Sequence, residues 1–158
     1  MKRTPITLKG FKKLKAKLEF LKKKKRPKII SSIISARSQG DLRENAEYQA
    51  AREEQSFYEG KIKEIELKLS TAQIIDITKI VNVGKIIFGS TIVIQNMKTK
   101  KKLIYKIVGE EESDIKNNLI SVNSPIARGL IGKSVGKIAV IVTPKGKVEY
   151  KILTVKYI

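Results

Sequence analysis

Apolar residues recur at intervals of three and four in the first part of the chain. They stand at Leu8, Phe11, Leu14, Leu18 and Leu21, and lysine fills most other positions. This spacing predicts an amphipathic helix with Thr7 as its N-cap. Pro27 has no backbone N–H, so we expect a kink or a restarted helix there. The apolar positions of residues 29–34 follow in a rotated register, and Gly40 suits the left-handed position after a helix end.

A second helical stripe begins after Gly40. The sequence Asp41-Leu42-Arg43-Glu44 opens it, and apolar residues continue at helical spacing to about Ser70. Two helices of about 30 residues joined by a short turn lie antiparallel, and at about 1.5 Å per residue they reach roughly 45 Å. Their facing sides are rich in Leu, Ile and Ala, as an antiparallel coiled coil requires. The alternative, a globular helix bundle, needs further long helices that the chain does not offer, so we predict a projecting hairpin.

Short β-branched runs replace the helical period after Asp76. They cover residues 85–88, 91–95, 102–108, 119–122, 137–143 and 147–155, and glycine or proline separates most of them. Such runs predict the strands of a small antiparallel sheet. One short helix is predicted over residues 124–132, with Ser124 as its N-cap and Pro125 in its first position. This helix would cover one face of the sheet.

Together these patterns predict an α+β chain of two domains. We expect an N-terminal coiled-coil hairpin over residues 1–76, a linker over 77–82, and an antiparallel sheet with one short helix over 83–158. No apolar run approaches the roughly 20 residues of a membrane span. The N-terminus leads into polar sequence, unlike a secretory signal. The expectation is a cytoplasmic protein that makes no use of a membrane.

The amino-acid composition excludes several common kinds of catalytic and metal site. The 158 residues include no Cys and no His, which excludes disulfides, thiolate metal sites, His-ligated zinc and histidine bases. With 34 Lys and Arg against 15 Asp and Glu, the net charge is +19, and this indicates attraction to a polyanion. Thirteen of the basic residues lie in residues 1–30, where Glu19 is the only acid. The basic run Lys22-Lys23-Lys24-Lys25-Arg26 has a bland alternative, a compositional bias toward Lys, and its role stays open.

Two acidic residues stand at the turn between the long helices. Asp41 and Glu44 are three apart at the start of the second stripe, the spacing of a capping box, and the helix dipole favours both carboxylates there. Two carboxylates on an exposed turn can also offer oxygen ligands to Mg²⁺, although weakly unless another molecule supplies the remaining ligands. The two interpretations are compatible, because a cap fixes the backbone that directs the acids.

Arginines flank the same turn. Arg37, Arg43 and Arg52 lie close to the acids in sequence, and a guanidinium can contact phosphate through two hydrogen bonds. The alternative is that these arginines form a solvated face. Glu47, among other acids, lies between them, which argues against a broad, non-specific DNA-binding surface at the turn.

Several motifs carry a resemblance that spans essentially the whole chain. They are Pro5-Ile6-Thr7 with Gly10, Arg26-Pro27, Gly40-Asp41-Leu42-Arg43-Glu44-Asn45-Ala46-Glu47-Tyr48, Ala50-Ala51-Arg52-Glu53, Ile107-Val108-Gly109, Ile120-Ser121-Val122-Asn123-Ser124-Pro125-Ile126-Ala127-Arg128-Gly129-Leu130-Ile131-Gly132 and Thr143-Pro144. With these the chain closely resembles the GreA family of bacterial transcript-cleavage and elongation factors. The related GreB branch is less similar, because the stretch after Tyr48 follows the GreA pattern.

The resemblance implies a fold and a set of roles. It implies an FKBP-like C-terminal domain that docks on RNA polymerase, and a hairpin that enters the polymerase's secondary channel. Asp41 and Glu44 match the acids that act in trans with a Mg²⁺ shared with the polymerase, while Arg37 and Arg52 match positions that contact the extruded RNA. The remaining roles implied are support of the turn by Asn45 and Tyr48, and polymerase docking by Asn123, Ser124, Pro125 and Ile126.

We therefore predict a transcription elongation factor that stimulates the Mg²⁺-dependent RNA cleavage of a backtracked bacterial RNA polymerase. It should have no tightly bound cofactor, no complete active site of its own, and a monomeric state. Two alternatives stay open at this point. One is an inhibitor that occupies the channel of RNA polymerase, and the other is a general nucleic-acid-binding or chaperone module driven by the positive charge.

Overall fold

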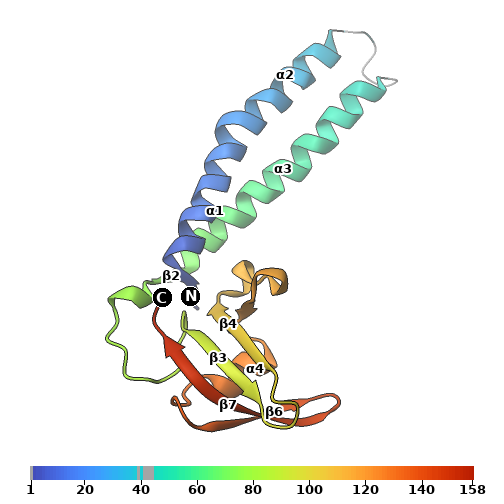
Figure 1. The fold of residues 1–158 in the computed structure, drawn as a ribbon. Coiled ribbons are helices and arrows are strands. Elements are labelled where there is room, and N and C mark those ends of the chain that lie inside the picture. Colours follow the sequence, from blue (N-terminus) through green and yellow to red (C-terminus); the bar gives the residue numbers. More distant parts are fainter. Residues whose placement is uncertain (1, 39, 41–44) are drawn as a thin grey trace. The chain divides into compact units, whose positions relative to one another are not determined.

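The computed structural model describes residues 2–38, 40 and 45–158. The chain forms two compact units (Figure 1). The hairpin unit comprises Lys2 and Phe11–Ala72, and the sheet unit comprises Arg3–Gly10 with Gln73–Ile158. The sheet unit thus takes in residues 3–10 and 73–82, which the sequence interpretation assigned to the hairpin and the linker.

Two short strands explain this difference. β1 (Thr4–Thr7) and β2 (Ala72–Ile75) pair in a two-stranded sheet, and neither strand was predicted. Beyond β2 a 3₁₀ helix, η2 (Ile77–Lys79), buries Ile77 to 5% exposure within the core of the sheet unit. The expectation of a free linker over residues 77–82 is therefore wrong for its first part.

The predicted helical hairpin is confirmed within the hairpin unit. Its first arm is α1 (Leu8–Phe20), a π-helical turn η1 (Leu21–Lys25) and α2 (Arg26–Arg37), and its second arm is α3 (Ala46–Thr71) (Figure 1). The arms pack through a small apolar core of Leu21, Ile62 and Ile65, surrounded by partly buried Leu14, Leu18, Tyr58 and Leu69. α3 begins at Ala46 with Asn45 as its N-cap, and the predicted helix opening at Asp41 lies outside the described residues.

The interruption predicted at Pro27 takes the form of the π-helical turn. Pro27 lies in the first turn of α2, and the backbone N–H of Arg26 donates to the carbonyl of Leu21, five residues back. A proline in an α-helix loses one hydrogen bond and its ring collides with the carbonyl four residues earlier. The wider turn just before Pro27 relieves that conflict, so the arm continues as a helix on both sides.

The sheet unit is built on a five-stranded sheet in the order β5-β4-β3-β7-β6. The expectation of a purely antiparallel sheet is wrong, because β4 and β5 pair in parallel while the other neighbours are antiparallel. Two 3₁₀ turns, η3 (Glu110–Glu112) and η4 (Ile115–Asn117), make the crossover that a parallel pair needs. The strands are β3 (Thr91–Asn96), β4 (Lys102–Val108), β5 (Leu119–Ser121), β6 (Ile138–Thr143) and β7 (Gly146–Lys156).

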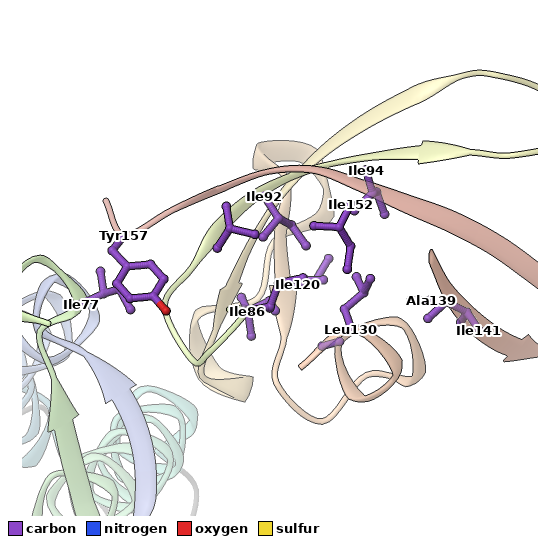
Figure 2. Packing of buried hydrophobic residues seen from close by; sticks show 13 residues of the cluster. Ile77, Ile86, Ile92, Ile94, Ile120, Leu130, Ala139, Ile141, Ile152 and Tyr157 are labelled. Carbon is purple, nitrogen blue, oxygen red and sulfur yellow. The ribbon is translucent and has the colours of Figure 1, made fainter. Parts of the chain in front are cut away.

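A short helix covers one face of this sheet, as predicted. In α4 (Pro125–Leu130), Ser124 is the N-cap and its hydroxyl accepts a hydrogen bond from Ala127 N at 3.3 Å. Ala127 and Leu130 are fully buried, and Figure 2 shows Leu130 among the isoleucines of the strands. Residues 85–88 were predicted as a strand and form none, since only Lys85 makes an isolated bridge. Their apolar character serves burial instead, because Ile86 is 0% exposed.

The carboxylate of Glu112 organises the start of α1 within the sheet unit. It accepts hydrogen bonds from Thr7 N at 3.0 Å, from the Thr7 hydroxyl, and from Gly109 N at 2.9 Å. The Thr7 hydroxyl in turn accepts from Gly10 N at 3.0 Å, which confirms Thr7 as the helix cap. A Cβ at Gly10 would lie 2.1 Å from a Glu112 oxygen, so only glycine fits beside this carboxylate without a rearrangement.

Candidate functional site

The two acids predicted to act at the turn, Asp41 and Glu44, lie outside the described residues, as does Arg43. The backbone on either side of them is described: α2 ends at Arg37, and α3 begins at Ala46. The roles of the two acids therefore remain predictions, and the geometry of the site rests on the residues that flank them.

Asn45 joins the two arms next to the predicted acids. Its side-chain oxygen accepts a hydrogen bond from Tyr48 N at 3.1 Å, which caps α3. Its side-chain nitrogen donates to the carbonyl oxygen of Ala36 at 2.5 Å, and Ala36 is 3% exposed. The Asn45 side chain thus accepts a hydrogen bond from a backbone N–H in the first turn of α3 and donates one to a backbone carbonyl in the last turn of α2. This geometry is what a residue that supports the turn needs.

Tyr48 and the two arginines occupy different environments. Tyr48 is half-buried in the first turn of α3. Arg37 and Arg52 are exposed, and in the described part of the chain neither forms an ion pair with another side chain. Their guanidinium groups are therefore accessible to a phosphate, as a contact with RNA requires.

An open hollow of about 400 Å³ lies between α2 and the start of α3. This hollow was not predicted from the sequence, although the serines of α2 stand at spacings of one and three and therefore fall on one side of the helix. Serine hydroxyls and one lysine give the α2 side of the hollow a polar lining, and a glutamate lies on the opposite arm. The residues that line the hollow are Lys28, Ser31, Ser32, Ser35, Ala36 and Glu47.

The basic run at residues 22–26 is largely engaged in ion pairs within the hairpin. Arg26 makes two hydrogen bonds to the Glu59 carboxylate, Nε to Oε1 at 2.7 Å and Nη2 to Oε2 at 2.9 Å. The Glu59 hydrogen bond raises the pKa of Arg26, and the Arg26 hydrogen bond lowers the pKa of Glu59 below its usual value. Lys22 pairs with Glu66 at 3.2 Å in the same way, from one arm to the other.

The predicted docking residues surround the N-terminus of α4. Asn123 and Pro125 are exposed, whereas Ser124 and Ile126 are partly buried. The Ser124 hydroxyl donates to the Ser121 carbonyl at 2.7 Å, and Asn123 N donates to the Ser121 hydroxyl at 3.1 Å. The Asn123 side-chain amide donates to the Glu110 carboxylate at 3.3 Å, so the loop is held by these hydrogen bonds and leaves the Pro125 ring exposed.

Within residues 2–38, 40 and 45–158, no group of three or more acidic side chains could hold a metal ion. None of the helices in that part of the chain is long and apolar enough to cross a membrane.

Comparisons with known proteins cover both units. A family model described as transcription elongation factor, N-terminal, matches residues 4–74. A second model, described as transcription elongation factor, GreA/GreB, C-terminal, matches residues 81–157. These matched ranges cover the three long helices and all five strands of the large sheet.

Several curated proteins are similar over the whole length. A transcription elongation factor GreA of Buchnera aphidicola subsp. Acyrthosiphon pisum is 61% identical over 154 residues, which are 98% of this chain and 97% of that protein. The GreA of Yersinia pestis is 59% identical over 158 residues, all of both proteins. Among solved structures, GreA factor homolog 1 of Thermus thermophilus is 22% identical with a TM-score of 0.44, over 98% of this chain and 99% of that one.

Proposed function

Because the chain belongs to the GreA/GreB family of transcription elongation factors, we propose that it stimulates RNA polymerase to cleave backtracked RNA. The hairpin unit enters the secondary channel of the polymerase, and the sheet unit docks at the rim of that channel. Cleavage creates a new RNA 3′ end in the active centre, and the arrested complex resumes elongation.

The observation that carries this proposal is that both units match one kind of protein. The two family models cover residues 4–74 and 81–157, and relatives about 60% identical align over nearly the whole chain. A helical hairpin alone, or a small mixed sheet alone, occurs with many functions. The combination in one chain is what supports a factor that delivers a hairpin and anchors it on the same partner.

Asp41 and Glu44 are the residues that we expect to act at the polymerase's active centre. Mg²⁺ usually retains several waters and takes one or two protein carboxylates together with substrate phosphates. The two acids would hold a Mg²⁺ shared with the polymerase and the RNA, and such an ion, when bound, activates a water for in-line hydrolysis of a phosphodiester. The chain itself contributes the two negative side chains and their placement, and it has no hydrolase activity alone.

The neighbouring residues assist this role. The two hydrogen bonds of Asn45 tie the end of α2 to the start of α3, the two helix ends that flank the acids in sequence. Exposed Arg37 and Arg52 would contact phosphates of the extruded RNA, while Asn123 and Pro125 would contact the polymerase. The protein acts in the cytoplasm as a monomer.

The test uses purified backtracked elongation complexes, Mg²⁺ and the full chain. We expect shortened RNAs with new 3′ ends that the polymerase can extend. Asp41→Ala combined with Glu44→Ala should abolish this cleavage while competition for the polymerase stays within about two-fold of the unsubstituted protein. Glu53→Ala, an exposed acid on α3, is the matched control and should leave cleavage unchanged.

The outcomes separate the alternatives. Halted complexes that stall without shortening their RNA would indicate a channel-occupying inhibitor. Binding to free RNA or DNA that falls steeply with salt, without any effect on polymerase, would indicate a general nucleic-acid-binding module. Full cleavage by the doubly substituted protein would refute the assignment of the two acids.

A further inference from the structure

The buried positions of the two hairpin arms recur at different intervals along the sequence. We call the contact surface between the two arms the seam. In α3, Ala51, Tyr58 and Ile65 lie on it at intervals of seven residues, the repeat of a coiled coil. In the other arm, Leu21 is 5% exposed and the next buried seam residue, Ile29, follows eight residues later at 3%. The first arm therefore carries one residue more than the heptad allows.

The next heptad of the first arm is regular again, and the extra residue falls in the π-helical turn. From Ile29 to Ala36, which is also 3% exposed, the interval is seven. In an uninterrupted α-helix one additional residue would turn the following seam by about 100°. The turn at Leu21–Lys25, closed by the bond from Arg26 N to Leu21 O, absorbs that residue and returns Ile29 to the seam.

Ion pairs from one arm to the other hold the turn in place. Arg26 makes its two hydrogen bonds to Glu59 directly after the turn. Lys25 pairs with Glu54 at 3.3 Å, and its ammonium lies 4.8 Å from the centre of the Tyr58 ring. These contacts fix the irregular turn of the first arm against regular positions of α3, so the extra residue is located at one defined place.

We propose that this π-helical turn, clasped by Arg26 and Glu59, is a positioning device for the end of the hairpin. It lengthens the first arm by one residue, up to about 1.5 Å, without disturbing the seam. The far end of that arm is the part that Asn45 ties to α3. Arg26 is a positioning residue, and the inference rests on the proposed function, since the predicted acids must arrive at the polymerase's active centre.

The expected loss of cleavage follows from how precisely a reaction requires its catalytic groups to be placed. Catalytic groups must be held to within about 0.5 Å of the productive geometry, and a misplacement of 1 Å can reduce a rate by about 10²-fold. A shift of up to one residue in one arm is therefore large enough to suppress cleavage. It would leave polymerase docking intact, because the docking residues belong to the other unit.

Deletion of Lys24 tests the inference, with Lys24→Ala as its matched control. Lys24 is exposed and forms no ion pair among the described residues, and its removal returns the spacing from Leu21 to Ile29 to seven. We expect the deletion to keep helix content and competition for polymerase and to lower thermal stability, because Pro27 loses the wider turn before it. It should lower cleavage at saturating factor at least ten-fold at a temperature where the variant is folded. Lys24→Ala, which keeps the length, should cleave within two-fold of the unsubstituted chain.

A second variant decides the matter if the deletion fails to fold. Arg26→Gln keeps the length and loosens the clasp, and it should reduce the saturating cleavage rate several-fold without changing the concentration needed for half-maximal cleavage. The inference is overturned if a folded deletion variant cleaves at full rate, or if Arg26→Gln does so when the deletion variant is unfolded. If the unsubstituted chain itself produces no cleavage, the proposed function fails and the inference falls with it.

Discussion

Asn45 provides the sharpest test of how the hairpin holds its two ends together. Asn45→Ala removes the cap of α3, which is worth about 1 kcal/mol, and the hydrogen bond to the Ala36 carbonyl, worth about 1 kcal/mol more. Asn45→Asp keeps an acceptor for Tyr48 N and loses the donor. The expected losses in the free energy of unfolding are therefore about 2 kcal/mol for the alanine and about 1 kcal/mol for the aspartate.

Thermal unfolding followed by far-ultraviolet circular dichroism measures both losses, because most helical residues belong to the hairpin unit. In a domain of 60–100 residues each kcal/mol lowers Tm by about 4–8 °C. Gln49→Ala, exposed on the next turn of α3, is the control and should change the free energy of unfolding by less than about 0.5 kcal/mol. An alanine variant as stable as this control would refute the two-ended role of Asn45. Equal losses for Asp and Ala would assign the whole effect to the amide donor.

Two further predictions concern the ion pair between Arg26 and Glu59 and the steric fit of Gly10 beside Glu112. Since Arg26 lowers the pKa of Glu59 in the folded chain, the stabilisation by this pair is present at neutral pH and is lost as pH falls below about 4.5. Glu59→Gln should remove part of the acid sensitivity of unfolding, and an unchanged pH profile would contradict the pairing. Gly10→Ala should destabilise the sheet unit by about 1–3 kcal/mol in urea unfolding, because its Cβ displaces the Glu112 carboxylate. A stability equal to that of the unsubstituted chain would show that Glu112 moves aside without cost.

The helical half of the fold was predictable because its pattern is long and regular. Apolar residues at helical spacing run from Leu8 to Leu21 and again through α3, and a long periodic segment is the most reliable signal a sequence contains. The start of α3 was harder to predict. Asp41 and Asn45 are both residue types that suit an N-cap, and the hydrogen bond from Tyr48 N to the Asn45 side chain identifies Asn45 as the cap of α3.

In the sheet unit, the pattern of apolar residues did not predict every strand correctly. An apolar run such as residues 85–88 reports burial, and burial does not require a strand. Ile86 fills the core from an irregular segment. The parallel pairing of β4 with β5 depends on the 3₁₀ turns between them, whose residues carry no strong signal.

The basic run illustrates how far a count of charges can mislead. Its role stayed open in the sequence, and the structure shows that Lys22, Lys25 and Arg26 each pair with a glutamate of α3 that lies 29 or more residues away in sequence. Such pairs become visible only when the register of the two arms is known, and that register depends on one residue absorbed in a π-helical turn. Within the run, Lys24 is exposed and forms no ion pair among the described residues, so most of the unpaired positive charge that can attract a polyanion lies elsewhere in the chain. Salt should therefore weaken the ion pairs between the arms and the encounter with a partner mainly through different residues.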